Sequence, residues 1–345
     1  MINLENLGIQ EISLQEFDGI CIGHAEDVEA ATGCTVLAAK EGMAAAVDIR
    51  GGGPASRESA LLEPLSSSEM IHAIVLSGGS AFGLEAANGV MEFLEEKDIG
   101  FDTGYAKVPL VCQSCIYDLG IGSSLRRPDK SMGYAACKNA FEINDGRKMG
   151  NIGAGIGATV GKARGGKSMM KSGLGIYCLA FGELKVGAVV VVNALGDIYD
   201  YRTQKKIAGM LNLEGNGFQD CQEELLRNLA AQEGDNLFTS NTTIGIVITN
   251  GDLNKMQLKR VCSAAHNAYA RTIRPVHTSA DGDSIYAVSA GKKIPANVDM
   301  VSILATEVMA MAVNKAVYSA KSWGEIPAAG DFTESEKSPA LFDVF

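Results

Sequence analysis

The sequence predicts sheets covered by helices, with strands and helices in both halves of the chain. Short apolar and β-branched runs bounded by turn residues predict strands at residues 72–76, 175–181 and 184–192, the last two forming a hairpin. After Thr242 the pattern alternates strand, helix, strand and helix. Because a sheet must bury its apolar face against another element, these runs favour helices packed on sheets.

Composition sets the broad class of the protein. The 345 residues are 46% hydrophobic and 21% charged, which is typical of a soluble globular protein. A net charge of −11 argues against a nucleic-acid or anionic-membrane partner. The long apolar pattern at residues 297–320 is interrupted by three charged residues, so we expect a buried helix and no membrane span. Residues 1–17 contain no Lys or Arg, which favours a cytoplasmic protein without a leader.

Metal and disulfide chemistry are not expected. Eight scattered cysteines in a chain without a leader predict buried thiols, and Cys112 and Cys115 form the only CxxC. The four histidines show no spacing typical of metal ligands. The sequence therefore predicts neither a metal nor another cofactor.

Local signals predict further elements. Residues 19–22, 34–37 and 43–49 read as three successive strands, and residues 132–141 and 222–232 as helices. We expect Ser80 and Asp252 to cap the helices that follow them. Residues 200–241 are polar and predict a connecting segment.

Residues 161–168 (GKARGGKS) match the phosphate-binding loop pattern GxxxxGK[ST]. Such a loop needs a helix directly behind it, whereas Gly173 and Gly175 would break that helix early. Nucleotide binding through Lys167 therefore stays a disfavoured alternative.

The chain is organised around residues 238–248 (FTSNTTIGIVI), where a polar segment runs into a buried strand. One interpretation is a polar strand edge, since Thr is common in strands. The other is that the Asn241–Thr242 bond is cut, so that the new amine of Thr242 acts as general base for its own hydroxyl.

Asp281 and Asp283 precede the next strand of this half. Carboxylates at positions i and i+2 of an extended segment share a face, and two close carboxylates perturb each other's pKa values. An Asp-Gly-Asp turn without chemistry is the alternative.

Seven ordered motifs resemble one family: residues 34–38 (CTVLA), 48–54 (DIRGGGP), 76–83 (LSGGSAFG), 153–162 (GAGIGATVGK), 192–197 (VNALGD), 241–247 (NTTIGIV) and 273–278 (IRPVHT). It is the DmpA-like self-cleaving aminopeptidase family, which includes β-aminopeptidases, D-/L-aminopeptidases and 6-aminohexanoate (nylon) oligomer hydrolases. The resemblance implies an α+β fold, the N-terminal-nucleophile-like αββα four-layer sandwich. It also implies a single domain over residues 1–345, cut into a large subunit (1–241) and a small one (242–345).

The resemblance also implies roles for individual residues. Thr242 matches the nucleophile, and Asn241–Thr242 the cut bond. Asp281 and Asp283 match the acidic pair of the oligomer-hydrolase branch, and Asn193 an amide that stabilises an oxyanion. Lys162 and Tyr117 match a Lys and a Tyr that line the site.

The sequence thus predicts an autoprocessed amide hydrolase or aminopeptidase that acts on short peptides or amino-acid amides. Hydrolysis of ω-amino acid oligomers, or an uncut scaffold without activity, are the alternatives. The expected partners are a small peptide or amide substrate, the second subunit and further copies, in a homo-oligomer of heterodimers.

Overall fold

One large sheet dominates the fold. The structure is a computed structural model that describes residues 5–166, 168–231 and 241–332. Within these residues ten strands form a sheet with the order β1-β11-β12-β15-β17-β3-β5-β8-β4, and β2 pairs with β3. Their bounds are β1 Ile9–Ile12, β2 Cys21–Asp27, β3 Thr32–Ile49, β4 Ala55–Arg57, β5 Ile71–Ser77, β8 Val111–Cys115, β11 Leu174–Phe181, β12 Leu184–Asn193, β15 Thr242–Gly251 and β17 Ser284–Ile294.

The long strand β3 joins two halves of this sheet. Residues 32–38 of β3 pair with β2 and residues 34–38 with β5, whereas residues 44–49 pair with β17. The register with β5 shifts between Ala38 and Met43. The sequence predicted separate strands at 34–37 and 43–49, and this prediction was wrong because the chain bends without leaving the sheet.

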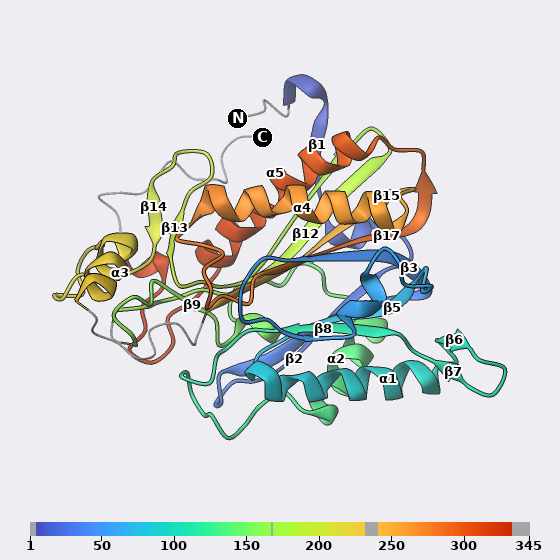
Figure 1. Cartoon of the computed structure of the whole chain (residues 1–345), viewed down its shortest axis with the longest axis horizontal. Coiled ribbons are helices and arrows are strands. Elements are labelled where there is room, and N and C mark those ends of the chain that lie inside the picture. Colours follow the sequence, from blue (N-terminus) through green and yellow to red (C-terminus); the bar gives the residue numbers. More distant parts are fainter. Residues whose placement is uncertain (1–4, 167, 232–240, 333–345) are drawn as a thin grey trace.

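Helices cover the outer faces of both halves, which gives four layers (Figure 1). Helices α4 and α5 pack over β3, β11, β12 and β17, and α1 and α2 pack over β2, β3 and β5. Their bounds are α1 Ala86–Glu96, α2 Lys130–Glu142, α4 Lys255–Thr272 and α5 Val298–Tyr318. Helix α5 is long and apolar enough to cross a membrane, but 83% of its most apolar window is buried inside the protein. It is therefore a core helix, as the sequence predicted.

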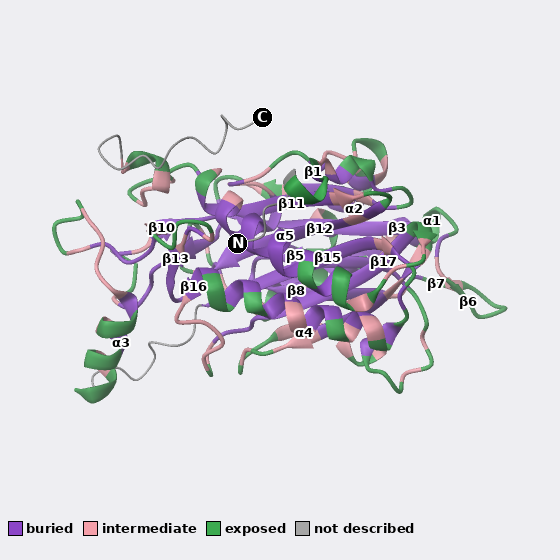
Figure 2. Cartoon of the chain, turned by 90° about the horizontal axis from the view of Figure 1, so that it is seen from above, coloured by how far each residue is buried: buried purple, intermediate pink, exposed green. Residues whose placement is uncertain are grey.

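Each interface between layers has its own hydrophobic core. Side chains alternate along the strands, so that Ile244, Ile246 and Ile248 of β15 point between the half-sheets and Val247 points toward α4 and α5. A third core lies between β5 and helices α1 and α2. Figure 2 shows that the strands of the sheet are largely buried, whereas α4 carries exposed and intermediate residues as well as buried ones. The αββα sandwich expected from the sequence is confirmed.

Two predicted caps were wrong. Ser80 has a φ of +53° and begins the 3-10 helix Ser80–Glu85, whose N-cap is Gly79. Helix α4 is capped by Asn254, which forms a reciprocal capping box with Gln257, and not by Asp252. The hydrophobic pattern of the sequence located both helices but did not identify their N-cap residues.

The segment before residue 232 is more ordered than a linker. Strands β13 (Asp197–Tyr199) and β14 (Lys206–Ala208) pair with each other, and helix α3 covers Cys221–Ala230. Buried Asp197 accepts hydrogen bonds from the backbone N–H groups of Met210 and Cys221 and pairs with Lys206. The rest of the predicted connection, residues 232–240, lies outside the described residues.

Candidate active site

Strand register brings the predicted residues to one place. Thr242 is the first residue of β15 and lies opposite Asn193, the last residue of β12. One residue earlier, Asn241 forms a parallel bridge with Asp281, just before β17. Positions far apart in the sequence therefore meet at the ends of three adjacent strands.

The Thr242 hydroxyl lies against the peptide bond that precedes it. Its Oγ1 donates a hydrogen bond to the carbonyl oxygen of Asn241, and the backbone N–H of Gly282 donates to the same oxygen at 3.1 Å. Thr242 is only 5% exposed. A Cβ at residue 282 would lie 2.9 Å from Thr242 Oγ1 and 3.1 Å from the carbonyl oxygen of Gly53. Glycine therefore leaves room for the hydroxyl and lets an amide reach the carbonyl.

Asn193 is held from both ends of its side chain. The Nζ of Lys162 donates to Asn193 Oδ1 at 2.6 Å and to its backbone carbonyl oxygen at 3.1 Å. The Nδ2 of Asn193 donates to the backbone carbonyl of Tyr117 at 3.0 Å, while the Thr159 N–H in β9 (Thr159–Val160) donates to Oδ1 at 3.1 Å. These contacts fix which end of the amide is the donor.

Lys162 is a buried cation of unusual acidity. Burial lowers the pKa of its ammonium to about 7, against the opposing charges of Asp281 and Asp118. A lysine with such a pKa can lose its proton near neutral pH, which suits acid–base chemistry.

The two carboxylates are buried and have different partners. Asp281 Oδ2 accepts from the backbone N–H of Thr278 at 2.6 Å, and Asp283 Oδ1 accepts from that of Thr243 at 2.7 Å. Burial and then the charge of Asp283 raise the pKa of Asp281 to about 6. One member of the pair can therefore keep a proton at a pH at which a solvated carboxyl would have lost it.

Comparison with known proteins identifies the family. Residues 13–325 match the family described as Peptidase family S58. The chain belongs to this family. It is therefore a hydrolase of the DmpA-like aminopeptidases, as its motifs suggested.

Curated relatives of this S58 chain have two kinds of name. A protein of Mycobacterium leprae (strain TN), named as an uncharacterized aminopeptidase, is 36% identical over 343 residues, or 91% of this chain and 92% of the relative. A 6-aminohexanoate-oligomer endohydrolase of Agromyces sp. (strain KY5R) is 32% identical over 275 residues, which cover 79% of this chain and 74% of the enzyme.

Solved structures share the fold. The L-aminopeptidase D-Ala-esterase/amidase of Ochrobactrum anthropi, a variant of the Ntn hydrolase fold, superposes with a TM-score of 0.69 at 16% identity, over 95% of both chains. A β-aminopeptidase of Burkholderia sp. gives a TM-score of 0.62 at 16% identity, over 95% of this chain and 94% of the enzyme.

Some site residues were not found from the sequence. Lys171 is fully buried, and its Nζ donates to the carbonyl oxygens of Ala158 at 2.7 Å and Ser172 at 3.1 Å. Asp118 accepts from the Thr32 hydroxyl and the Gly79 N–H, and its charge acts on both Lys162 and Lys171. Asp118 could have been suspected from its neighbour Tyr117. Lys171 gives no signal, because burial of a lysine is a property of the fold.

Tyr117 contacts the site through its backbone, whereas the sequence predicted a side chain that lines the site. It is half-buried, and its contact with Asn193 is made by the backbone carbonyl. A role for its side chain stays a prediction.

The eight cysteines are free thiols, and all but Cys21 are buried, in agreement with the sequence.

The phosphate-loop match lacks the context that nucleotide binding needs. Its described residues, 161–166 and 168, connect β9 to β10 (Met170–Lys171), and β11 follows at Leu174. Lys167 lies outside the described residues. Because strands and not a helix follow the match, no helix N-terminus can face a phosphate there.

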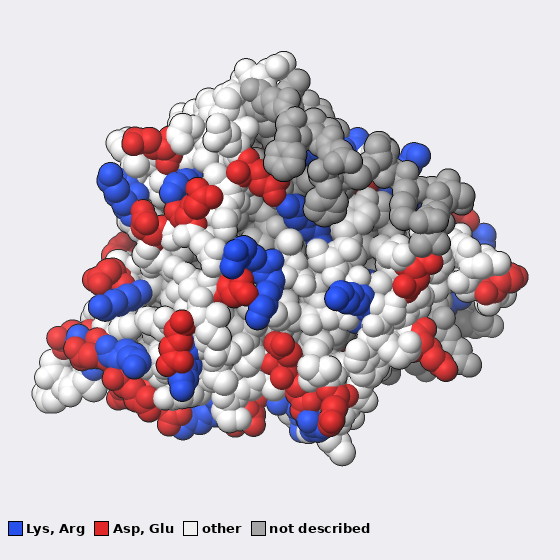
Figure 3. Space-filling view, turned by 180° about the vertical axis from the view of Figure 1, so that it is seen from behind, with Lys and Arg blue, Asp and Glu red and all other residues white. Residues whose placement is uncertain are grey.

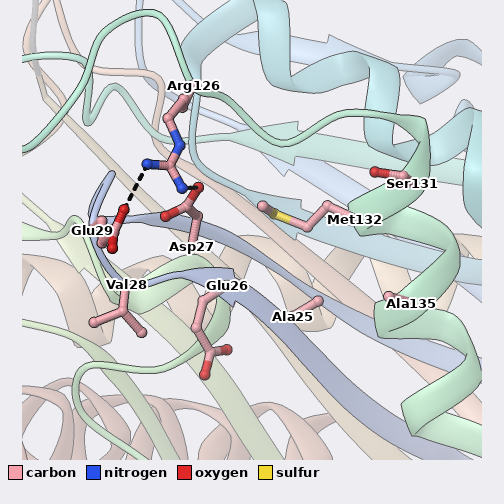
Figure 4. Close-up of a pocket in the computed structure, with 9 residues that line it drawn as sticks. All are labelled: Ala25, Glu26, Asp27, Val28, Glu29, Arg126, Ser131, Met132 and Ala135. Atoms are coloured by element: carbon pink, nitrogen blue, oxygen red, sulfur yellow. Dashed lines mark hydrogen bonds and ion pairs between the residues drawn. The ribbon is translucent and has the colours of Figure 1, made fainter.

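A separate surface hollow contains none of the predicted residues. It is lined by residues 25–29 at the end of β2, by Arg126 and by α2 residues, and Arg126 pairs with Asp27 and Glu29 (Figure 4).

The face seen in Figure 3 carries interspersed acidic and basic side chains. Within the described residues, no three His, Cys, Asp or Glu side chains are grouped to hold a metal ion.

The raised pKa of Asp281 predicts a pH-dependent stability effect. Ionising a carboxyl whose folded-state pKa is above its unfolded value destabilises the fold, so stability is lost as pH rises from about 4 to about 6. In a Thr242→Ala chain, Asp281→Asn should therefore raise the free energy of unfolding at pH 8 by about 1–3 kcal/mol and have little effect near pH 4. Urea unfolding at both pH values measures this.

The control for this measurement is Asp252→Asn, whose side chain is 66% exposed. It should change stability by less than about 0.5 kcal/mol at either pH. An Asp281→Asn chain that is no more stable than its parent at pH 8 would contradict the assignment of a buried carboxylate that destabilises the fold when it is ionised.

Proposed function

We propose that this S58 chain cuts its own Asn241–Thr242 bond and then hydrolyses amides with Thr242 as its N-terminal nucleophile. The observation that carries the proposal is the Asn241 carbonyl, which accepts hydrogen bonds from both the Thr242 hydroxyl and the Gly282 N–H. The attacking oxygen thus lies beside the bond to be cut, and an amide is aimed at the oxygen on which negative charge develops.

Self-cleavage would proceed by an N→O acyl shift. Thr242 Oγ1 attacks the carbonyl carbon of Asn241, its proton passes to a base, and the Gly282 N–H stabilises the oxyanion. We assign the base role to Asp281, whose backbone bridges to that of Asn241 and whose carboxyl has a pKa raised to about 6. The C–N bond then breaks, the proton goes to the nitrogen of Thr242, and water opens the resulting ester.

Catalysis would reuse the same groups. The freed α-amine, with an ordinary pKa of about 8, takes the proton of the Thr242 hydroxyl as it attacks the substrate carbonyl. Once residue 241 no longer occupies its place, the Gly282 N–H is available to the substrate oxyanion. Lys162 holds Asn193 beside Thr242, so the amide of Asn193 can assist. The leaving amine takes the proton, and water releases the acyl group from Thr242.

Short peptides or amino-acid amides are the substrate class that we favour, supported by the aminopeptidase relatives. Hydrolysis of ω-amino acid oligomers is the second candidate, supported by the 32% identical endohydrolase and by the buried Asp281–Asp283 pair. Rates on an aminoacyl amide and on a 6-aminohexanoate dimer distinguish the two.

The two lysines of residues 160–170 should behave differently. Lys162→Met removes the cation that holds Asn193 and should lower amide hydrolysis at least ~10²-fold. Lys167→Met, the matched substitution, should stay within about threefold of the parent, an effect under ~1 kcal/mol. Initial rates on one amide measure both variants. The opposite ranking would support the phosphate-loop interpretation instead.

The processing step itself can be observed by intact-protein mass spectrometry with N-terminal sequencing. The parent should give residues 1–241 and 242–345, which stay associated because β15 and β17 lie between strands of the larger piece. Thr242→Ser should cut, since it keeps the hydroxyl, whereas Thr242→Ala should stay whole and inactive.

Thr249→Ala is the matched control for this test, because Thr249 lies on the same strand and its hydroxyl donates to the backbone carbonyl oxygen of Lys185, away from the bond to be cut. This variant should be cut normally. A full-length chain that hydrolyses amides without being cut would refute the mechanism. A parent that stays whole and hydrolyses nothing would favour the scaffold alternative.

A further inference from the structure

Within the described residues, the Asp283 carboxylate has three hydrogen bonds, and His277 makes two of them. Its backbone N–H donates to Asp283 Oδ2 at 3.1 Å, and its ring Nδ1 lies 2.9 Å from the same oxygen. The third donor is the backbone N–H of Thr243, next to the proposed nucleophile. Asp283 Oδ2 already accepts from the His277 backbone N–H, and we take it to accept from the ring as well, so that Nδ1 carries the hydrogen of this bond.

The backbone of His277 is held in an uncommon conformation. Its φ is +59°, in the left-handed region that non-glycine residues seldom adopt and that Asn, Asp and His tolerate best. Such a conformation disfavours most side chains by about 1–2 kcal/mol. In this conformation, both the backbone N–H and the ring Nδ1 of His277 lie within hydrogen-bond distance of the same oxygen, Asp283 Oδ2.

The His277 ring is also fixed from the side of α4. It packs edge-on against His266, with ring centroids 4.8 Å apart and an angle of 72° between the planes, and lies 6.1 Å from the ring of Tyr269. His266 is fixed in turn by a contact of 3.0 Å between its Nε2 and the carbonyl oxygen of Asp48. The imidazole therefore has little freedom to leave Asp283.

We propose that His277 is a positioning residue of the hydrolase, which holds Asp283 so that this carboxylate fixes the peptide between Thr242 and Thr243. The chain of contacts runs from α4 through the His277 ring and Asp283 to the Thr243 N–H. Without the Nδ1–H donor, Asp283 loses a hydrogen bond inside the protein and turns toward other donors. The Thr242 hydroxyl then loses its alignment with the carbonyl that it attacks.

This inference rests on the proposed function. Two substitutions of His277 test it, by Asn and by Asp, which have the same shape as each other but differ in whether they can donate a hydrogen bond. Both Asn and Asp tolerate the positive φ, and an Asn amide places an N–H where the ring Nδ1–H lies, whereas an ionised Asp has no donor. We expect His277→Asn to keep kcat within about fivefold of the parent. His277→Asp should lower kcat at least ~50-fold with KM within threefold, and should slow self-cleavage as well.

His72→Asn is the matched control, because Nδ1 of this remote histidine in β5 accepts from the Leu110 N–H and an Asn oxygen can replace it. It should stay within twofold of the parent in kcat. Circular dichroism establishes folding of every variant. If the His277→Asp chain does not fold, His277→Ala takes its place, with the same expected loss relative to His277→Asn.

Equal kcat and equal self-cleavage in the Asn and donor-free variants would overturn the positioning role, whether both match the parent or both lose activity. In that case an active, cut parent would leave the proposed function intact. A parent that is neither cut nor active would instead refute the proposed function, so the two failures are distinguishable.

Discussion

The register of β15 between β12 and β17 is the constraint on which the site depends. It sets Thr242 opposite Asn193 and Asn241 beside Asp281. Hydrophobic side chains enforce it, because Ile244, Ile246 and Ile248 fill one core and Val247 another. A slip by one residue would exchange the two faces of the strand. The interior packing of the sandwich thus positions the hydroxyl beside the bond that precedes it.

Buried charge is the second feature that organises the site. Lys162, Lys171, Asp118, Asp281 and Asp283 are all less than 9% exposed, and burial shifts the pKa of both lysines to about 7 and that of Asp281 to about 6. Buried ionisable groups are destabilising unless they are paired and hydrogen-bonded. Buried ionisable groups with pKa values shifted toward neutrality are typical of sites that carry out acid–base chemistry. Under the proposed mechanism, the stability lost by burying these charges is the cost of acid–base groups that titrate near neutral pH.

The sequence predicted the elements of the fold better than their ends and connections. Hydrophobic periodicity located β11, β12, β15 and α5, but it divided β3 in two and placed caps at Ser80 and Asp252, because a cap depends on local backbone geometry. Motifs pointed to Thr242, Asn193 and the acidic pair, which the fold brings together. The sequence analysis did not single out Lys171 or His277, since neither the burial of Lys171 nor the backbone conformation that brings His277 onto Asp283 leaves a recognisable pattern in the sequence.

The central claim is that Thr242 carries the acyl group during turnover. The most direct measurement mixes the cut enzyme with a small aminoacyl p-nitrophenyl ester, quenches it in acid within the steady state, and determines the mass and fragmentation pattern of each subunit. The account predicts that residues 242–345 gain one acyl group, located on the Thr242 side chain, and that a Thr242→Ala chain gains none. An acyl group found on another residue of the site, with Thr242 unmodified, would contradict it.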